Sequence, residues 1–253
     1  MDHPINQFKA ALAERRRQIG MWSALASPVA AEILAHAGFD WVLIDMEHAP
    51  NDLPQVLAQA QTLAAGPAPV LCRPAWNDMV LIKRILDIGI QSLIIPFVQT
   101  AQEARAAVAA TRYPPGGVRG VAGGSRASHY GRVPGYQQNA ASEIAVVVQI
   151  ETREAVDRIE EIAAVDGIDA LFVGPADLAA SMGHLGDLQH PDVQAAIAEA
   201  AERCHAAGKP IGTLAIDKPV ADRYFEMGYD FIAVAVDSVL LARTADALAK
   251  SFR

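Results

Sequence analysis

The sequence predicts a single (β/α)8 barrel over residues 1–253, an α/β fold with an extra helix in front of its first strand. Short apolar segments alternate with helical segments eight times, without the apolar–polar alternation of half-exposed strands, as expected when parallel strands are buried on both faces. The length of 253 residues matches the roughly 250 that such a barrel needs. An open dinucleotide-binding sheet would need a Gly-x-Gly-x-x-Gly turn after an early strand, and the sequence has none.

Residues typical of helix starts and ends indicate where the helices lie. Ser27 is a predicted N-cap with Pro28 at the first helical position, Thr100 is another N-cap, and Gly208 and Gly228 mark helix ends. Strands are expected at Gln18–Ser23, Trp41–Met46, Pro69–Arg73, Gln91–Val98, the two ends of the Ile144–Leu178 unit, Pro210–Ala215 and Phe231–Val236. Helices are expected at 5–16, 27–38, 53–65, from Asn77 or Asp78 to near Gly89, after Thr100, and at 153–166, 193–207, 218–227 and 238–252.

Composition narrows the class of protein. A hydrophobic content of 52% supports a large core, and a net charge of −8 argues against a nucleic-acid surface. Cys72 and Cys204 show no metal-ligand spacing and are expected to be reduced thiols of a cytoplasmic protein. No apolar run reaches the roughly 18 residues of a membrane span, and the first residues do not resemble a signal peptide.

The Ile144–Leu178 unit carries the strongest chemical signal. Two apolar strands flank a helical segment, Glu151 follows the first strand, and Asp177 lies just past the second. In a strand–helix–strand unit both carboxylates emerge at the carboxyl edge of the sheet, where α/β folds bind ligands. Two converging carboxylates indicate a hard divalent cation, whereas the simpler interpretation is that Glu151 only stabilises a helix N-terminus.

Other predicted strand ends add polar groups at the same edge. They are Asp45, Glu47 and His48 after the second strand, Arg73 after the third, Gln149 on the same side as Glu151, and Gly174-Pro175-Ala176-Asp177 after the sixth. Lys209 precedes the seventh strand and is expected at the opposite edge. A long loop is expected from Pro114 to about Asn139.

Four segments together resemble one enzyme family. They are Asp45-Met46-Glu47-His48-Ala49-Pro50-Asn51-Asp52, Tyr113-Pro114-Pro115-Gly116-Gly117-Val118-Arg119-Gly120, Gln149-Ile150-Glu151-Thr152 and Phe172-Val173-Gly174-Pro175-Ala176-Asp177-Leu178. In this order they resemble the class II pyruvate aldolases of the 4-hydroxy-2-oxoheptanedioate aldolase (HpcH/HpaI) family, in the phosphoenolpyruvate/pyruvate barrel superfamily. The resemblance covers nearly the whole chain. It implies metal-dependent cleavage or condensation of 4-hydroxy-2-oxo acids, giving pyruvate or hydroxypyruvate and an aldehyde.

The resemblance also implies roles for single residues. Glu151 and Asp177 would hold Mg²⁺, Mn²⁺ or Co²⁺, and Arg73 would stabilise the developing enolate and anchor the oxo acid. His48 would be the general acid or base, with Asp45 orienting its ring and Glu47 in a supporting position. The remaining substrate contacts would come from Gln149, Gly174, Pro175, the backbone amides near Ala176 and Asp177, and the apolar Val118 and Leu214 on the aldehyde side. The long loop from Pro114 to about Asn139 would shape that side of the cavity.

The superfamily further implies a homo-oligomer, in this family a hexamer built as a trimer of dimers, with the last helix exchanged between subunits. No nucleic acid or membrane is expected as a partner. Three other functions compete. A class I aldolase would need a Schiff-base lysine inside the barrel, an acyl-CoA lyase a larger basic surface, and a non-catalytic oxo-acid-binding protein would bind without turnover.

Overall fold

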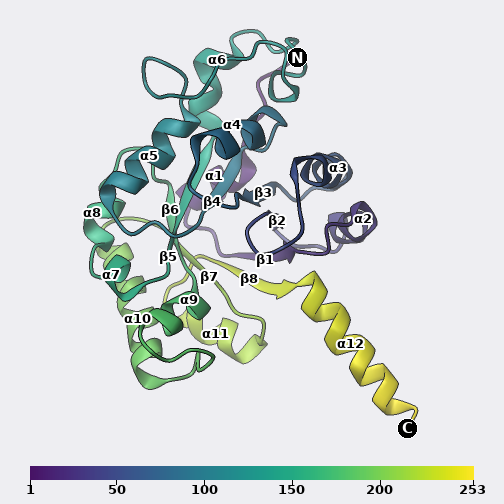
Figure 1. The fold of residues 1–253 in the computed structure, drawn as a ribbon, viewed down its shortest axis with the longest axis vertical. Helices are drawn as coiled ribbons and strands as arrows, with labels where there is room; N and C mark the ends of the chain where they lie inside the picture. Colours follow the sequence, from purple (N-terminus) through teal and green to yellow (C-terminus); the bar gives the residue numbers. More distant parts are fainter.

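Eight parallel strands close into a barrel in the computed structural model, which describes residues 1–253 (Figure 1). The strands are β1 Gln18–Ser23, β2 Trp41–Asp45, β3 Val70–Arg73, β4 Ser92–Ile95, β5 Ala145–Ile150, β6 Ala170–Val173, β7 Ile211–Leu214 and β8 Phe231–Val236. Each strand pairs with its sequence neighbours, and β8 pairs with β1 to complete the ring. The predicted fold class is therefore confirmed, including the helix in front of the first strand.

The helices follow the strands and surround the barrel (Figure 1). They are α1 Gln7–Ala13, α2 Pro28–Ala35, α3 Leu53–Leu63, α4 Met79–Asp87, α5 Ala101–Thr111, α6 Tyr136–Asn139, α7 Arg153–Val156, α8 Ile159–Ala163, α9 Pro175–Ser181, α10 Pro191–Ala206, α11 Lys218–Glu226 and α12 Asp237–Ser251. Ser27, Asp78 and Thr100 cap α2, α4 and α5 through their side chains, as the sequence predicts. No helix of the structure is both long enough and apolar enough to cross a membrane.

The barrel interior is filled by aromatic side chains at its amino-terminal end. Phe8 of α1 packs against Trp41 and Phe231, with ring centroids 6.0 and 5.5 Å apart. Gly212 leaves room for Phe231, because a Cβ at this position would lie 2.3 Å from the ring. This packing closes the amino-terminal end and leaves the carboxyl end of the strands open for a site.

The structure differs from the prediction in three segments. The expected helix at 153–166 is divided into α7 and α8, which break at Asp157 and Arg158. The fourth strand ends at Ile95, three residues before the predicted end. The long loop follows α5 and contains two 3-10 turns, Arg126–Ser128 and Ala140–Glu143, in addition to α6.

The last helix does not cover its own barrel. Figure 1 shows α12 leading away from β8, with the C-terminus at its far tip. Its only buried residue is Asp237, whereas Leu240, Leu241 and Leu248 are all more than half exposed. The apolar face that the sequence predicts to pack against a barrel is therefore free in the single chain.

Candidate active site

The carboxyl ends of the strands surround a cavity of about 380 Å³ that contains most of the predicted site. The predicted residues that line it are Asp45, His48, Arg73, Gln149, Gly174, Pro175, Ala176, Asp177 and Leu214. Side chains two positions apart share a face of a strand. Each polar side chain at a strand end therefore points into the barrel, like the apolar side chains two and four residues before it. Trp41 and Leu43 lead to Asp45, Leu71 leads to Arg73, and Ala145 and Val147 lead to Gln149.

Arg73 and Asp45 form a buried two-pronged ion pair at the centre of the site. Their strands are in register, and Arg73 Nε and Nη2 donate to the two carboxylate oxygens of Asp45 at 2.8 and 2.7 Å. Burial opposes ionisation of Asp45, but the hydrogen bonds and charge of Arg73 outweigh it and lower the pKa of Asp45. Asp45 is predicted to orient the His48 ring, but the structure shows no hydrogen bond or ion pair between them, because both Asp45 oxygens accept from Arg73.

Glu47 is the functional candidate whose role the sequence underestimates. Its Oε2 lies 2.7 Å from Arg73 Nη1, without hydrogen-bond geometry, and 3.8 Å from His48 Nε2. Burial, together with the charges of Asp45 and Asp177, raises the pKa of Glu47. Residues two positions apart share a face of a strand, so alternation would put Glu47 on the same side as Asp45, although β2 ends at Asp45 and the chain bends before Glu47. Glu47 rather than Asp45 is thus the acid beside His48.

Replacing Asp45 with asparagine should destabilise the fold. Nε and Nη2 of the buried Arg73 would lose their charged partner, while Nη1 would still face Glu47. We therefore expect a loss of about 1.5–3 kcal/mol in the free energy of unfolding. The lowered pKa of Asp45 means that its carboxylate contributes stability above the unfolded pKa of about 3.9. That contribution is lost as the pH falls through the folded value.

Urea unfolding of wild type and Asp45→Asn at pH 7 and at acid pH measures this difference. The difference in unfolding free energy between the two proteins should be largest at pH 7 and should decrease below about pH 4. A difference that stays constant with pH would contradict an ionised Asp45–Arg73 pair.

Glu151, just past the end of β5, is held by two hydrogen bonds. Its Oε1 accepts from the backbone N–H of Phe97 at 2.6 Å, and its Oε2 accepts from Gln149 Nε2 at 2.9 Å. Burial, joined by the negative charges of Glu47 and Asp177, raises the pKa of Glu151 to about 7, although the Phe97 N–H opposes the rise. Several carboxylates thus lie close together beside Arg73.

Gly174 is required by this arrangement. A Cβ at position 174 would lie 2.5 Å from Glu151 Oε2 and 3.3 Å from Gln149 Nε2. Gly174→Ala should therefore displace the Glu151 carboxylate and sharply reduce divalent-metal binding and activity. Calorimetric Mn²⁺ titration checks this, with Gly123→Ala as the control because a Cβ there meets nothing within 4 Å. Unchanged Mn²⁺ affinity in Gly174→Ala would show that Glu151 is not held where a metal needs it.

The remaining predicted residues divide between the cavity wall and the opposite edge. The His48 side chain is 65% exposed and reaches the cavity, and Asp177 lies in the first turn of α9. Val118 does not line the cavity: its N–H donates to Ala109 near the end of α5, which lies at the amino-terminal edge. The loop follows a helix rather than a strand, so within one chain it cannot shape the aldehyde side.

Several lining residues were not predicted. They are Trp22, Ala24, Phe172, Leu188, Gln189, Ala215, Ile216, Asp217, Val220, Tyr224, Val236 and Ser238. Trp22 and Phe172 end the inward-facing columns of β1 and β6, which strand alternation could have indicated. Leu188 and Gln189 come from the loop before α10, whose path no periodicity encodes. No lysine lines the cavity, which removes the structural basis for a Schiff base.

Comparison with known proteins finds relatives that cover nearly the whole chain. Residues 18–244 match the family described as HpcH/HpaI aldolase/citrate lyase. The 4-hydroxy-2-oxo-heptane-1,7-dioate aldolase of Klebsiella pneumoniae subsp. pneumoniae is 54% identical over 248 residues, covering 98% of this chain and 94% of the relative. The protein of that name from Escherichia coli is 53% identical, covering 98% and 95%. A crystal structure of a family protein from Burkholderia cenocepacia J2315 has a TM-score of 0.94 at 44% identity, covering 98% of this chain and all of that one.

Proposed function

The chain belongs to the HpcH/HpaI aldolase/citrate lyase family, and we propose that it cleaves 4-hydroxy-2-oxo acids to pyruvate and an aldehyde with the help of a divalent cation. It is an aldolase, a carbon–carbon lyase of the class II pyruvate type. The observation that carries the proposal is the cavity at the strand ends, where a buried arginine, a histidine and several carboxylates converge. The proposed substrate is 4-hydroxy-2-oxo-heptane-1,7-dioate, on which the two curated relatives act by name.

The residues present fit a divalent cation held by Glu151 and Asp177. Burial and the negative charges of Glu47 and Asp177 raise the pKa of Glu151, so several carboxylates lie close enough together to share one cation. Carboxylate oxygens with open positions suit Mg²⁺, Mn²⁺ or Co²⁺. When bound, such an ion would act as a Lewis acid that stabilises negative charge developing on the oxo acid. Gln149 would then orient Glu151 through its 2.9 Å hydrogen bond.

The other groups would bind the oxo acid and move its proton. Arg73 faces the cavity with its guanidinium fixed by Asp45, so it would offer positive charge to the enolate oxygen without reorganising. The first-turn amides of α9, at Ala176 and Asp177, have no acceptors within the helix and would receive the substrate carboxylate. His48 at the cavity mouth would transfer a proton at the aldehyde-derived oxygen, with Glu47 beside its ring.

The aldehyde end of the substrate would extend toward the part of the wall that includes Leu214. Leu214, Val220 and Val236 give this part an apolar character. We retain Leu214 as a proposed aldehyde contact. For Val118 the same role would require a neighbouring subunit, because it lies at the opposite edge of its own barrel.

A donor and acceptor panel tests the proposed function. Pyruvate and hydroxypyruvate are offered with several aldehydes, including succinic semialdehyde, with and without EDTA. We expect aldol products only when a divalent cation is present. Turnover that survives EDTA would contradict the proposal, and binding of pyruvate without any turnover would favour an oxo-acid-binding protein instead.

We also propose that the single barrel domain of residues 1–253 assembles into a cytoplasmic hexamer, a trimer of dimers. The free thiols of Cys72 and Cys204 are buried and unpaired, as expected in a reducing compartment. The exposed apolar side chains of α12 support a subunit contact formed by exchange of this helix.

Leu241→Asp/Leu248→Asp should reduce the size of the assembly, because both leucines are more than half exposed and a charge there would have to be buried in a contact. Sedimentation velocity at micromolar concentration measures it. Leu185→Asp is the control, an 85% exposed leucine away from α12. A wild-type chain that sediments as a monomer would contradict the assembly.

A further inference from the structure

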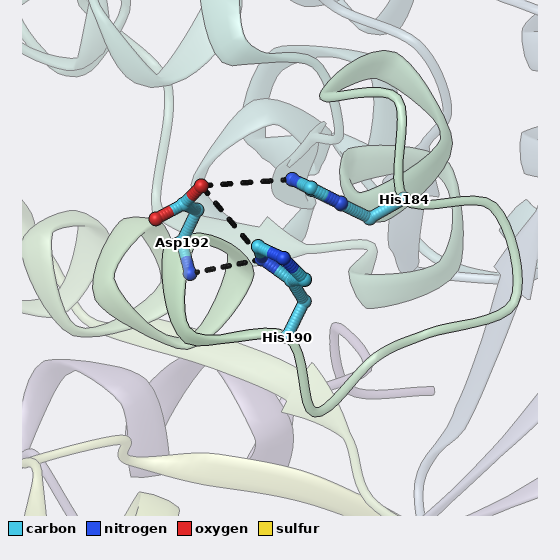
Figure 2. A group of neighbouring side chains, drawn as sticks. All are labelled: His184, His190 and Asp192. Carbon is cyan, nitrogen blue, oxygen red and sulfur yellow. Dashed lines mark hydrogen bonds and ion pairs between the residues drawn. The ribbon is translucent and has the colours of Figure 1, made fainter.

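Two histidines and an aspartate gather in the segment between α9 and the first turn of α10, outside the catalytic residues described above (Figure 2). His184 Nε2 and His190 Nδ1 each lie 3.7 Å from Asp192 Oδ2. The two imidazole rings stack face to face, with centroids 3.5 Å apart. Figure 2 shows both rings next to the same carboxylate oxygen.

We propose that His184, His190 and Asp192 form a second metal site that binds a borderline transition ion such as Zn²⁺. All three ligand atoms lie within 4.8 Å of one another. Two ligands of one tetrahedral zinc ion, each at about 2.0–2.2 Å, would be roughly 3.4 Å apart, close to the 3.7 Å of both His–Asp pairs. Both histidines thus already lie at a suitable distance from the aspartate to share one ion with it.

The change required on binding is local. The backbone N–H of Asp192 donates to His190 Nδ1 at 3.3 Å, a long hydrogen bond that a metal ion would replace. The stacked rings would separate, so that both nitrogen lone pairs point at the ion. The Asp192 side chain is 69% exposed and both histidines are partly exposed, so an ion reaches all three from solvent.

Ligand chemistry separates this site from the catalytic one. Imidazole nitrogens favour Zn²⁺, Ni²⁺ or Cu²⁺, whereas Glu151 and Asp177 offer only the oxygens that suit Mg²⁺ or Mn²⁺. Three protein ligands leave a fourth position for water. A different ion is thus expected at each site.

The position of the cluster gives it a consequence for the cavity. Leu188 and Gln189, which line the cavity, lie in the loop between His184 and His190. The loop is held by Gln194, which donates to the Leu188 carbonyl at 2.7 Å, and by Arg223, which donates to Gln189 Oε1 at 2.9 Å. An ion bridging His184 and His190 would close the ends of this loop and brace that part of the cavity wall.

Calorimetric Zn²⁺ titration of the full chain in excess Mg²⁺ tests the proposal. Wild type and the carboxylate variant Glu151→Ala/Asp177→Ala should both bind Zn²⁺ at the histidine cluster. His184→Gln/His190→Gln should lose that binding, and Asp192→Asn should weaken it. His36→Gln is the matched control, because His36 is exposed at the end of α2 and belongs to no group of three metal-ligating side chains.

A second measurement detects Zn²⁺ binding at the histidine cluster independently of enzyme activity. Imidazole ¹⁵N chemical shifts of His184 and His190 should move on Zn²⁺ addition, and amide hydrogen exchange across residues 184–190 should slow in wild type but not in the double variant. Circular dichroism confirms that each variant is folded. Equal Zn²⁺ binding by wild type and His184→Gln/His190→Gln, or loss of all Zn²⁺ binding in the carboxylate variant, would overturn the proposal.

Discussion

Replacing Glu151 or Asp177 with alanine is expected to abolish both Mn²⁺ binding and aldol turnover. Both side chains are hard oxygen donors: Asp177 lines the cavity, and Glu151 accepts a hydrogen bond from the lining residue Gln149. Removing either leaves too few protein ligands for a hydrated divalent cation. Asp177 is exposed in the first turn of α9, so its removal should leave stability nearly unchanged. Buried Glu151 accepts two hydrogen bonds, so its removal should also cost about 1–3 kcal/mol of unfolding free energy.

Electron paramagnetic resonance of Mn²⁺ measures the binding, and a coupled assay for pyruvate measures the turnover. Glu154→Ala is the control, because it removes one carboxylate from an exposed position on α7 and changes the net charge equally. Full activity in a metal-stripped wild-type enzyme would contradict the metal-dependent mechanism.

His48→Ala and Arg73→Ala are expected to fail at different steps. Loss of His48 should reduce aldol cleavage by the roughly 10²–10⁴-fold typical of a missing acid–base group, while part of the exchange of pyruvate C3 protons with solvent survives. Loss of Arg73 should slow both processes, because both require an enolate and the positive charge of Arg73 would stabilise it. Deuterium incorporation into pyruvate, measured beside aldol cleavage, separates the two.

The lysine substitution tests how much of the Arg73 effect depends on geometry. Arg73→Lys should not rescue fully, because an ammonium cannot give the paired 2.8 and 2.7 Å bonds to Asp45 and also face Glu47. His36→Ala serves as the histidine control on the outside of the barrel. A normal rate of pyruvate C3 proton exchange in Arg73→Ala would show that the arginine does not stabilise the enolate and only binds substrate.

Much of the barrel could be predicted from local patterns. Buried parallel strands are short apolar runs, so β1 and β8 match their predicted bounds, and Ser27 and Thr100 mark their helices through side-chain caps. Helix interruptions are harder to detect, because the segment 153–166 keeps helical spacing across the break between α7 and α8. The direction of α12 could not be predicted, because its apolar face would fit its own barrel or a neighbouring one equally well.

Residue identities at the strand ends predicted which groups meet, but not how they pair. Asp45, Arg73 and Gln149 reach one cavity because strand alternation is regular. The pairing follows from register: Asp45 stands opposite Arg73 across β2 and β3, so the arginine takes both carboxylate oxygens. Glu47 lies beyond the strand, where alternation no longer applies, and so its contacts with Arg73 and His48 could not be predicted.

Proton exchange at C3 of pyruvate without any aldehyde tests the central claim most directly. The wild-type enzyme in D₂O should incorporate deuterium into pyruvate when Mg²⁺, Mn²⁺ or Co²⁺ is present, stop after EDTA treatment, and resume when the cation is restored. Nuclear magnetic resonance of the methyl group follows the exchange. Deuterium incorporation that continues at the same rate in the metal-stripped enzyme would contradict the account.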